Sequence, residues 1–421
     1  MAKNTDLGTV ADGGLLDRRV FLKKGFVFSV AALASKSSYA SIENYRQSWM
    51  EKPGDSFSNY GQPSVHEKEM IRWAMENSNA KGNGVSWTPL HDLEGTITPN
   101  GLHFERHHNG VPQIDPQKHQ LLIHGAVNRP LVFDMNALLQ YPMISRQCFI
   151  ECGGNSNAGW RDEPIQTAVG YFHGMASCSE WTGIPLNVLL NEAKLRGRAK
   201  WVIAEGGDAS MMNVSIPLEK MMDDCFLAIY QNGERIRPEN GYPLRLIVPG
   251  WEGVVNVKWL RRLHLSNTPT MARNETSKYT ELLPSGKARQ FTFVMEAKSL
   301  ITNPSYGYQL DKMGYYQISG LAWSGRGKIV KVDVSADGGK TWAEAELQTP
   351  VLSKCFTRFR IPWDWNGEQA ILKSRATDET GYVQPERKEL IAERGKHGYF
   401  HYNGIVSWEI TSKGVVSHVY A

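Results

Sequence analysis

The stretch Phe149-Ile-Glu-Cys152-Gly-Gly-Asn155 places a cysteine between an apolar run and two glycines. The apolar run predicts a β-strand, and the glycines predict a turn whose backbone a bulky group can approach closely. A cysteine on an apolar strand is most often a buried structural thiol. The alternative is a thiolate that binds a soft metal. The motifs that surround Cys152 decide between the two.

Several polar motifs flank this segment in a fixed order. They are Phe104-Glu-Arg-His-His108 upstream and, downstream, Glu205-Gly-Gly-Asp208, Ser215-Ile-Pro217, Asn240-Gly-Tyr-Pro-Leu-Arg245 and Asn256-Val-Lys258-Trp259. With Cys152-Gly-Gly-Asn155 they resemble the motifs of the sulfite oxidase family, whose cysteine binds molybdenum. Each motif alone is weak, and the ordered set carries the resemblance.

The resemblance implies an α+β fold with two domains. A sulfite-oxidase-type molybdopterin-binding domain is expected over residues 86–284, and an immunoglobulin-like β-sandwich that forms a homodimer over 285–421. The predicted metal ligand is Cys152, and Arg106 and Tyr279 are expected on the substrate side. The residues expected to hold one molybdenum-molybdopterin are Phe104, Glu105, Arg106, His107, His108, Asp208, Asn240, Arg245, Asn256, Val257 and Lys258.

The physical chemistry of these residue types agrees with that cofactor. A pterin phosphate and its polar rings need Arg, Lys, His and Asn donors and a carboxylate. Taken singly, each residue could equally be an ordinary surface or capping group, whereas the set is explained by a cofactor. Two positions depart from the family pattern, since His107 stands where Asn is usual and Asn240 where His is common.

The N-terminal region has the pattern of an export signal. Arg18-Arg19 precede an apolar run from Gly25 to Ala34, and small residues end at Ala40. This run is shorter than the ~20 residues that span a bilayer. We therefore expect residues 1–40 to be a twin-arginine signal and the protein to reach the periplasm folded. Residues 41–85 are expected to be an extension with an amphipathic helix around 65–75, and no membrane span is expected.

The second half of the chain has a different pattern. Beyond Pro284-Ser-Gly286 helical periodicity gives way to short alternating runs, at residues 315–322, 329–334, 356–361 and 370–376. Asp337-Gly-Gly339 predicts a tight turn between two of them. Earlier in the chain, residues 120–124 predict a strand and residues 186–193 a helix. Strands at this spacing are typical of a β-sandwich.

This sequence has other residues where the family has substrate arginines: Ser156 and Asn157 follow the cysteine motif, and Asn403 aligns with a C-terminal arginine. Fewer cations weaken the binding of a small dianion such as sulfite. The same departure resembles the sulfane dehydrogenase branch of the family, which implies sulfane sulfur on a carrier protein as substrate. Oxidation of free sulfite in the periplasm is the alternative, and a binding module without catalysis is a third that leaves the pterin motifs unexplained.

Composition excludes several other functions. The net charge is +4 and no basic block occurs, so nucleic-acid binding is not expected. The sequence has no Cys-x-x-Cys-His motif, and no haem is expected in this chain. Electrons must then pass to a separate protein, for which the resemblance implies a c-type cytochrome subunit. The remaining cysteines, Cys148, Cys178, Cys225 and Cys355, have no assigned role, and Cys148 and Cys178 are expected to be structural.

Overall fold

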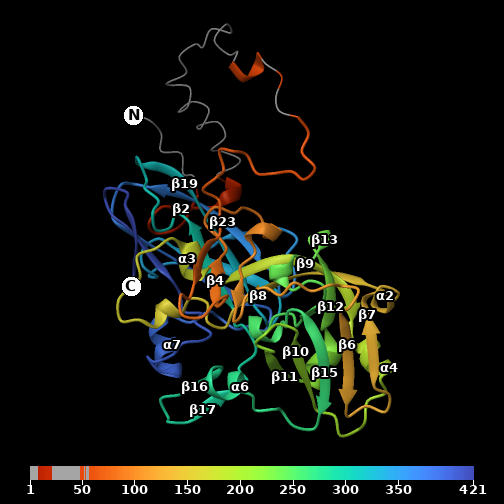
Figure 1. Cartoon of the computed structure of the whole chain (residues 1–421). Helices are drawn as coiled ribbons and strands as arrows, with labels where there is room; N and C mark the ends of the chain where they lie inside the picture. Colours follow the sequence, from red (N-terminus) through yellow and green to blue (C-terminus); the bar gives the residue numbers. More distant parts are fainter. Residues whose placement is uncertain (1–7, 21–47, 52, 54–55) are drawn as a thin grey trace, which may run out of the picture.

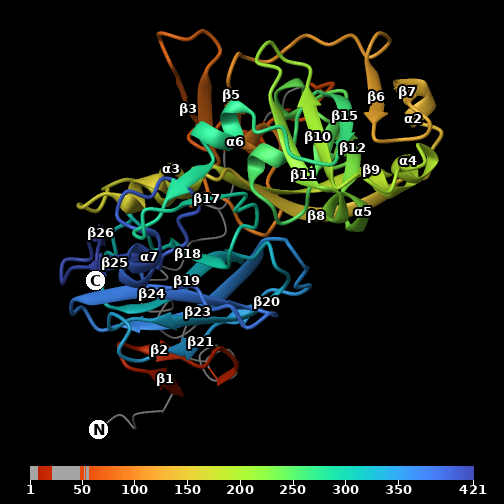
Figure 2. The same ribbon diagram turned by 90° about the horizontal axis from the view of Figure 1, so that it is seen from below.

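Strands dominate the fold and gather into two domains that are stacked on one another in Figure 2. The computed structural model describes residues 8–20, 48–51, 53 and 56–421 (Figure 1). The first domain carries the polar motifs that surround Cys152, and the second is the sandwich expected from the alternating runs. Strand β8 (Ile144–Glu151) runs along the boundary between them and ends at Cys152.

The first domain is built on two five-stranded sheets. One has the order β11-β10-β15-β6-β7, in which β15 and β6 are parallel; its strands are Gln120–Gly125 (β6), Leu131–Asp134 (β7), Trp201–Gly206 (β10), Asn213–Pro217 (β11) and Leu260–Ser266 (β15). The other joins β8 to Ala176–Pro185 (β9), Phe226–Gln231 (β12), Glu234–Arg235 (β13) and Arg245–Ile247 (β14). A core that includes Leu121, Ile184, Leu227 and Leu263 lies between them.

Short helices and two small sheets complete this domain. The helices are Met135–Leu138 (α2), Val169–His173 (α3), Leu186–Glu192 (α4), Leu218–Asp223 (α5) and Arg273–Ser277 (α6). The three-stranded sheet holds Trp73–Glu76 (β3), Gly84–Trp87 (β4) and Arg106–His107 (β5), and the hairpin holds Thr280–Leu282 (β16) and Ala288–Gln290 (β17). The turn of that hairpin contains Pro284-Ser-Gly286, where the composition changes.

The second domain is a sandwich of two antiparallel sheets. One contains Lys298–Asn303 (β18), Gly314–Trp323 (β19), Glu346–Leu347 (β22) and Thr357–Trp365 (β23). The other contains Ile329–Ser335 (β20), Ala343–Glu344 (β21), Ala370–Asp378 (β24), Ser407–Ile410 (β25) and Val416–Val419 (β26). Trp323, Trp363 and Trp408 are buried in the core between them. The α+β class, the sandwich and its predicted strands are confirmed.

Residues 8–20 pack against the sandwich. Strands Thr9–Ala11 (β1) and Leu15–Leu16 (β2) extend its first sheet, and Leu15 pairs with Trp363 of β23. The Trp363 indole donates to the Gly13 carbonyl at 2.6 Å. At Gly14, φ is +90° and an added Cβ would lie 2.1 Å from the Asp364 carbonyl oxygen, so only glycine fits. The apolar run and the predicted cleavage site at Ala40 lie outside the described residues.

Two expectations for secondary structure are wrong. Residues 65–75 form turns and the start of β3 instead of a helix, because β3 pairs with β4 and Trp73 stacks on Trp87 at 4.5 Å. The apolar side chains of this stretch, including Val65 and Ile71, stay exposed, so no core exists for a helical face. In the second domain a helix was missed at Arg387–Arg394 (α7), which begins with a Glu386/Glu389 capping pair.

Within the described residues, no helix combines the length and apolar character that a membrane crossing requires.

Candidate active site

The β8 strand delivers Cys152 to the meeting point of two tightly packed loops. An added Cβ at Gly153 would lie 2.8 Å from a carboxylate oxygen of Glu252, and one at Gly253 would lie 3.2 Å from the Cys152 Cα. Only glycines allow this approach. The Cys152 amide donates to the Met175 carbonyl at 2.9 Å, which fixes the end of the strand. The predicted strand, turn and thiol position are therefore confirmed.

The thiol of Cys152 opens into a cavity with an empty volume of about 750 Å³. Burial raises the pKa of this thiol, while a backbone hydrogen bond from Gly154 and the charge of Arg106 oppose the rise. A bound cation would favour the thiolate further, since coordination deprotonates a thiol. The residues on the cavity wall include Phe104, Arg106, His107, His108, Cys152, Asp208, Asn240, Arg245, Asn256, Val257, Lys258 and Tyr279. With one exception, Glu105, the structure brings every predicted site residue together.

One wall of the cavity carries two cations, the buried Arg245 and the half-buried Lys258. Arg245 is 5% exposed and donates to the carbonyls of Asn240 and Asn256, at 2.9 and 3.2 Å. No carboxylate forms an ion pair with either cation in the described part of the chain. Burial lowers the pKa of Arg245 to about 9 and that of Lys258 well below its usual value. Buried unpaired charge is costly, so this wall fits a bound anion such as a phosphate.

Two oxygen atoms on the same cavity also lack partners. Asn240 donates through its side-chain nitrogen to Gln231 at 3.0 Å, which turns its oxygen away from that contact. That Asn240 oxygen and the Oδ1 of Asp208 are buried without a hydrogen bond among the described residues. Buried acceptors are nearly always satisfied in folded proteins. The pair therefore fits a ligand that carries N–H donors, as a pterin does.

Asn256 and Val257 contribute in a different way. The side chain of Asn256 accepts from the Val248 amide at 2.8 Å and donates to the Glu252 carbonyl at 3.1 Å, so its polar atoms hold the loop instead of facing a ligand. Val257 is 5% exposed and offers an apolar surface to the cavity. Asn256 thus positions the loop that carries Val257 and Lys258.

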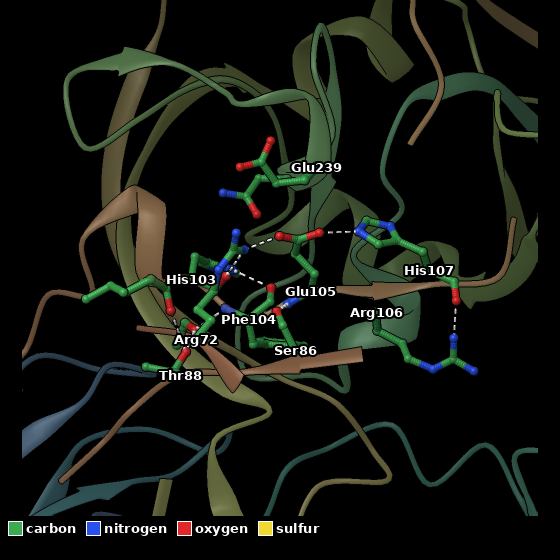
Figure 3. A network of polar contacts seen from close by, with 12 residues as sticks. Arg72, Ser86, Thr88, His103, Phe104, Glu105, Arg106, His107 and Glu239 are labelled. Atoms are coloured by element: carbon green, nitrogen blue, oxygen red, sulfur yellow. Dashed lines mark hydrogen bonds and ion pairs between the residues drawn. The ribbon is translucent and has the colours of Figure 1, made fainter. Parts of the chain in front are cut away.

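The Glu105 side chain does not face the cavity, so the structure gives its carboxylate no route to the cofactor expected there. Figure 3 shows its carboxylate between Arg72 and His107. The reason is strand alternation: along this extended segment Phe104 points into the cavity, and Glu105 points to the other side. Glu105 accepts from the Nε2 of His107 at 2.6 Å. Its function is therefore to orient the imidazole that does line the cavity.

The same contacts determine the protonation of His107. Lys258 donates to its Nδ1 at 2.8 Å, so Nδ1 is an acceptor and Nε2 carries the proton given to Glu105. Burial lowers the pKa of His107, which keeps the ring neutral. Burial and the charge of Arg106 also lower the pKa of His108, to about 4. Both rings therefore remain neutral beside the cations.

Arg106 lies where the narrow cavity opens into a much wider one. Figure 3 shows its guanidinium pointing away from the Glu105 contacts, with a hydrogen bond to the carbonyl of His107. No carboxylate pairs with it among the described residues. A guanidinium held this way is free to bind an oxyanion.

Tyr279 lines both cavities, as Arg106 does, and its ring stacks on Phe400 with the ring centroids 4.8 Å apart. Burial and the nearby Cys152 and Glu252 raise the pKa of its phenol, so it stays protonated and can donate. Arg106, His108, Cys152 and Tyr279 line both cavities, so the two are continuous around the thiol.

The three positions expected to lack arginines differ in placement. Asn157 is half-buried on the wall of the wide cavity. Ser156 is buried, and its hydroxyl is bound to Lys298 and His173, each at 2.6 Å. Asn403 is buried away from both cavities and donates to the Ala297 carbonyl and the Tyr382 hydroxyl, at 3.1 and 3.2 Å. Asn403 therefore lines neither cavity, and its alignment with a family arginine stays a prediction.

Sequence reasoning also missed two buried ion pairs beside Cys152. Lys298 of β18 binds Glu151 at 3.0 Å, and His401 lies 3.1 Å from Glu252. Both pairs join the cysteine loops to the second domain. Their partners are far apart in the sequence, and no local motif marks Lys298 or His401.

Comparison with known proteins agrees with this geometry. The chain is 44% identical to a chain of the sulfane dehydrogenase SoxCD from Paracoccus pantotrophus, with a TM-score of 0.87, over 90% of this chain and 98% of that one. It is 30% identical over 317 residues to the mitochondrial sulfite oxidase of Mus musculus, covering 70% of this chain and 58% of that protein. The chain belongs to the sulfite oxidase family of molybdenum enzymes.

Family models divide the chain where the structure does. Residues 108–274 match the oxidoreductase molybdopterin binding domain, and residues 289–406 match the Mo-co oxidoreductase dimerisation domain. The NADH nitrate reductase of Solanum lycopersicum is 28% identical over 378 residues, which are 77% of this chain and 41% of that protein. The chain thus spans about two fifths to three fifths of these two curated relatives.

Proposed function

We propose that this chain is the molybdenum subunit of a sulfane dehydrogenase, which oxidises sulfane sulfur attached to a carrier protein. Family membership supports molybdenum-dependent oxidation of sulfur. The observation that carries the finer assignment is the continuity of the thiol cavity with a wide, open one, which has room for a peptide arm. Trp73, Trp87 and Tyr171 line the wide cavity, so its walls suit an extended chain better than a small dianion.

The residues present fit a molybdenum-molybdopterin. Arg245 and Lys258 would hold the phosphate, the free oxygens of Asn240 and Asp208 would accept from the pterin, and Cys152 would bind the metal. When bound, the group supplies two-electron redox chemistry and the transfer of oxygen to sulfur. The family resemblance supports these roles. So do the buried polar groups on the cavity wall that have no partner among the described residues.

The protein's own part in the reaction is binding and orientation. Arg106 would bind the oxyanion of the oxidised sulfur, and Tyr279, which lines the same cavities, would donate a hydrogen bond to it. His107 and His108, both neutral, add no competing charge. The apolar and aromatic walls exclude water from the buried side of Cys152.

Electrons leave to another protein in this proposal. The sequence contains no Cys-x-x-Cys-His motif, and a c-type cytochrome subunit is the proposed acceptor. We further propose that the chain is exported folded to the periplasm through its Arg18-Arg19 signal, and that it forms a homodimer through the second domain. Sedimentation of the mature protein checks the dimer, and fractionation of cells with an Arg18→Lys/Arg19→Lys variant checks the route.

The proposed substrate is tested by steady-state turnover of the molybdenum-loaded protein with cytochrome c as acceptor. Free sulfite is compared with a persulfide on a cysteine of a carrier protein. We expect a much higher kcat/KM for the carrier-bound sulfur. Efficient oxidation of sulfite together with an inert carrier would replace this proposal by a periplasmic sulfite dehydrogenase.

A further inference from the structure

Cys178 and Cys355 face each other across the boundary between the two domains. Cys178 lies on β9 of the first domain, and Cys355 precedes β23 of the sandwich. Their sulfur atoms are 3.3 Å apart, although the residues are 177 positions apart in the sequence. A disulfide needs a separation of about 2.05 Å, so a small approach of the two sulfurs suffices to form one.

The backbone on both sides of this pair is fixed. Beside Cys355, the Lys354 carbonyl accepts from the Phe149 amide at 3.1 Å, and the Lys354 ammonium binds Asp224 at 2.6 Å. Cys178 exchanges two hydrogen bonds with Thr98, one of 3.1 Å to the threonine hydroxyl and one of 2.7 Å between backbones. Residues from both domains thus hold the two sulfurs in register.

We propose that Cys178 and Cys355 form a redox site in which oxidation by a peroxide joins the catalytic domain to the dimerisation domain through a disulfide. A small oxidant fits because the two residues are 0% and 2% exposed. Cys355 is the attacking sulfur, since it is the more accessible of the two and lies in a loop. Cys178, buried on a central strand, is the resolving sulfur.

The chemistry balances without any group from the active site. The Cys355 thiolate attacks one oxygen of hydrogen peroxide, the O–O bond breaks, and hydroxide leaves while a sulfenic acid forms. The sulfur of Cys178 then attacks that sulfenic acid, the S–S bond forms, and the S–O bond breaks. The oxygen leaves as water with the proton of the Cys178 thiol, and the proton that the Cys355 thiol gave up neutralises the hydroxide. Two thiols thereby lose two electrons and two protons to one peroxide, which becomes two waters.

The acidity of the two thiols agrees with these roles. The hydrogen bond from the Cys178 thiol lowers the pKa of Cys355, whereas burial raises the pKa of Cys178 well above its usual value. The thiolate therefore forms first on Cys355. Cys225 offers a contrast: it is also buried, its sulfur contacts the Lys220 carbonyl at 3.2 Å, and burial raises the pKa of its thiol above the usual range.

The cross-link would secure the contact on which the cysteine loop depends. Lys298, which binds Glu151 directly before Cys152, belongs to the same sandwich as Cys355. A covalent link between the domains restricts the unfolded chain and holds the two surfaces together. This inference does not rest on the proposed substrate, because its readouts need neither turnover nor cofactor.

The test is peptide mapping of the full chain after peroxide or reductant treatment, with alkylation of remaining thiols before digestion. We expect peroxide to give one linked peptide pair containing Cys178 and Cys355, a loss of two hydrogens in intact mass, and a Tm higher on the order of 5 °C. Cys355→Ser should remove the pair and the Tm shift, whereas Cys225→Ser should keep both. Two alkylated thiols at 178 and 355 after peroxide treatment of the wild type would overturn the proposal, as would a link from either to Cys148.

Discussion

Two groups of buried polar side chains flank Cys152, and they differ in how completely they are partnered. On the cofactor side, Arg245 and Lys258 have no carboxylate partner among the described residues, and oxygens of Asn240 and Asp208 are unsatisfied. On the sandwich side, Glu151 and Lys298 form an ion pair at 3.0 Å, and every contact of Glu151 is made within the protein.

The second group, here named the floor network, is a set of hydrogen bonds that joins Glu151, Asn155, Ser156, His173, Lys298 and Trp323. Glu151 accepts from Asn155 at 2.9 Å, from Lys298 at 3.0 Å and from the Trp323 indole at 2.7 Å. Lys298 also donates to Ser156, whose hydroxyl can then donate to a neutral His173. Because both charges of this network are partnered within the protein, it stabilises the loop itself, whereas the unpaired cations and oxygens on the cofactor side require a ligand. Among the described residues, the Nε2 of His173 is the atom of this network that has no hydrogen-bond partner.

Loss of the Cys152 thiol should have the largest effect on turnover, because this thiol is the predicted metal ligand between the two groups. We expect Cys152→Ser to keep the fold and lose turnover entirely, since a hydroxyl is a poor ligand for a soft site. Turnover and molybdenum content are measured on the same sample, with Cys225→Ser as the control for loss of a buried thiol. Wild-type turnover in Cys152→Ser would exclude ligation by this sulfur.

The floor network should be the next most sensitive. Lys298→Met leaves Glu151 buried and unpaired, and we expect the free energy of unfolding to fall by about 3–5 kcal/mol. The double variant Glu151→Gln/Lys298→Met should recover much of this loss, because no charge remains buried. Chemical denaturation of the cofactor-free protein measures both. A single variant as stable as wild type would show that the pair is not structural.

Arg245 should respond in the opposite way. Arg245→Met removes a buried cation that has no carboxylate partner, so the cofactor-free protein should be as stable as wild type or more stable. Cofactor retention should fall by roughly 10- to 150-fold, since a charge-assisted hydrogen bond contributes about 1.5–3 kcal/mol. Denaturation and metal analysis of the same preparations separate the two effects. If cofactor-free Arg245→Met lost as much stability as Lys298→Met, Arg245 would be a structural residue like Lys298, which would contradict the proposed difference between the two groups.

The residues on the cofactor side of Cys152 could be predicted from the sequence, whereas most of those on the sandwich side could not. The cofactor residues lie in short motifs whose polar side chains have no local explanation, and all but Glu105 reach one cavity. Strand alternation, which turns Glu105 toward Arg72, was visible in the sequence but not applied. Lys298 looks like any strand lysine, because its partner Glu151 is brought close only by the docking of the domains.

Contacts between segments that are distant in the sequence also explain the differences elsewhere. Residues 65–75 have a helical pattern but no core to face, so pairing of β3 with β4 prevails. Asn403 was placed by alignment of a short segment, and the structure buries its amide against Ala297 and Tyr382. Residues 8–20 belong to the segment 1–40, for which a targeting signal stays a prediction, and the structure adds a strand contact with β23 that no local pattern marks.

The smallest expected effect concerns the choice of substrate. It depends on two adjacent residues, Ser156 and Asn157, of which only Ser156 belongs to the floor network. Both Asn157 and Ser156 lie on the wall of the wide cavity, but the buried hydroxyl of Ser156 is bound to Lys298 within the floor network. An arginine at 157 can extend into the cavity and add a cation near Arg106. Its gain for free sulfite should be about 1 kcal/mol after solvent screening, or about fivefold in kcat/KM.

The measurement is kcat/KM for sulfite and for the carrier-bound persulfide in Asn157→Arg, with Ser156→Arg and Asn403→Arg as controls. Asn157→Arg should improve sulfite turnover and impair the carrier, whose arm must pass the added side chain. Ser156→Arg would place a second cation against Lys298, and Asn403→Arg would bury one beside the Ala297 carbonyl, so both should lower stability without improving sulfite turnover. Because all three variants add the same charge, a gain shared by all of them would come from net charge alone. A gain confined to Asn157→Arg locates anion selection on the open wall of the cavity and assigns the floor network to stability.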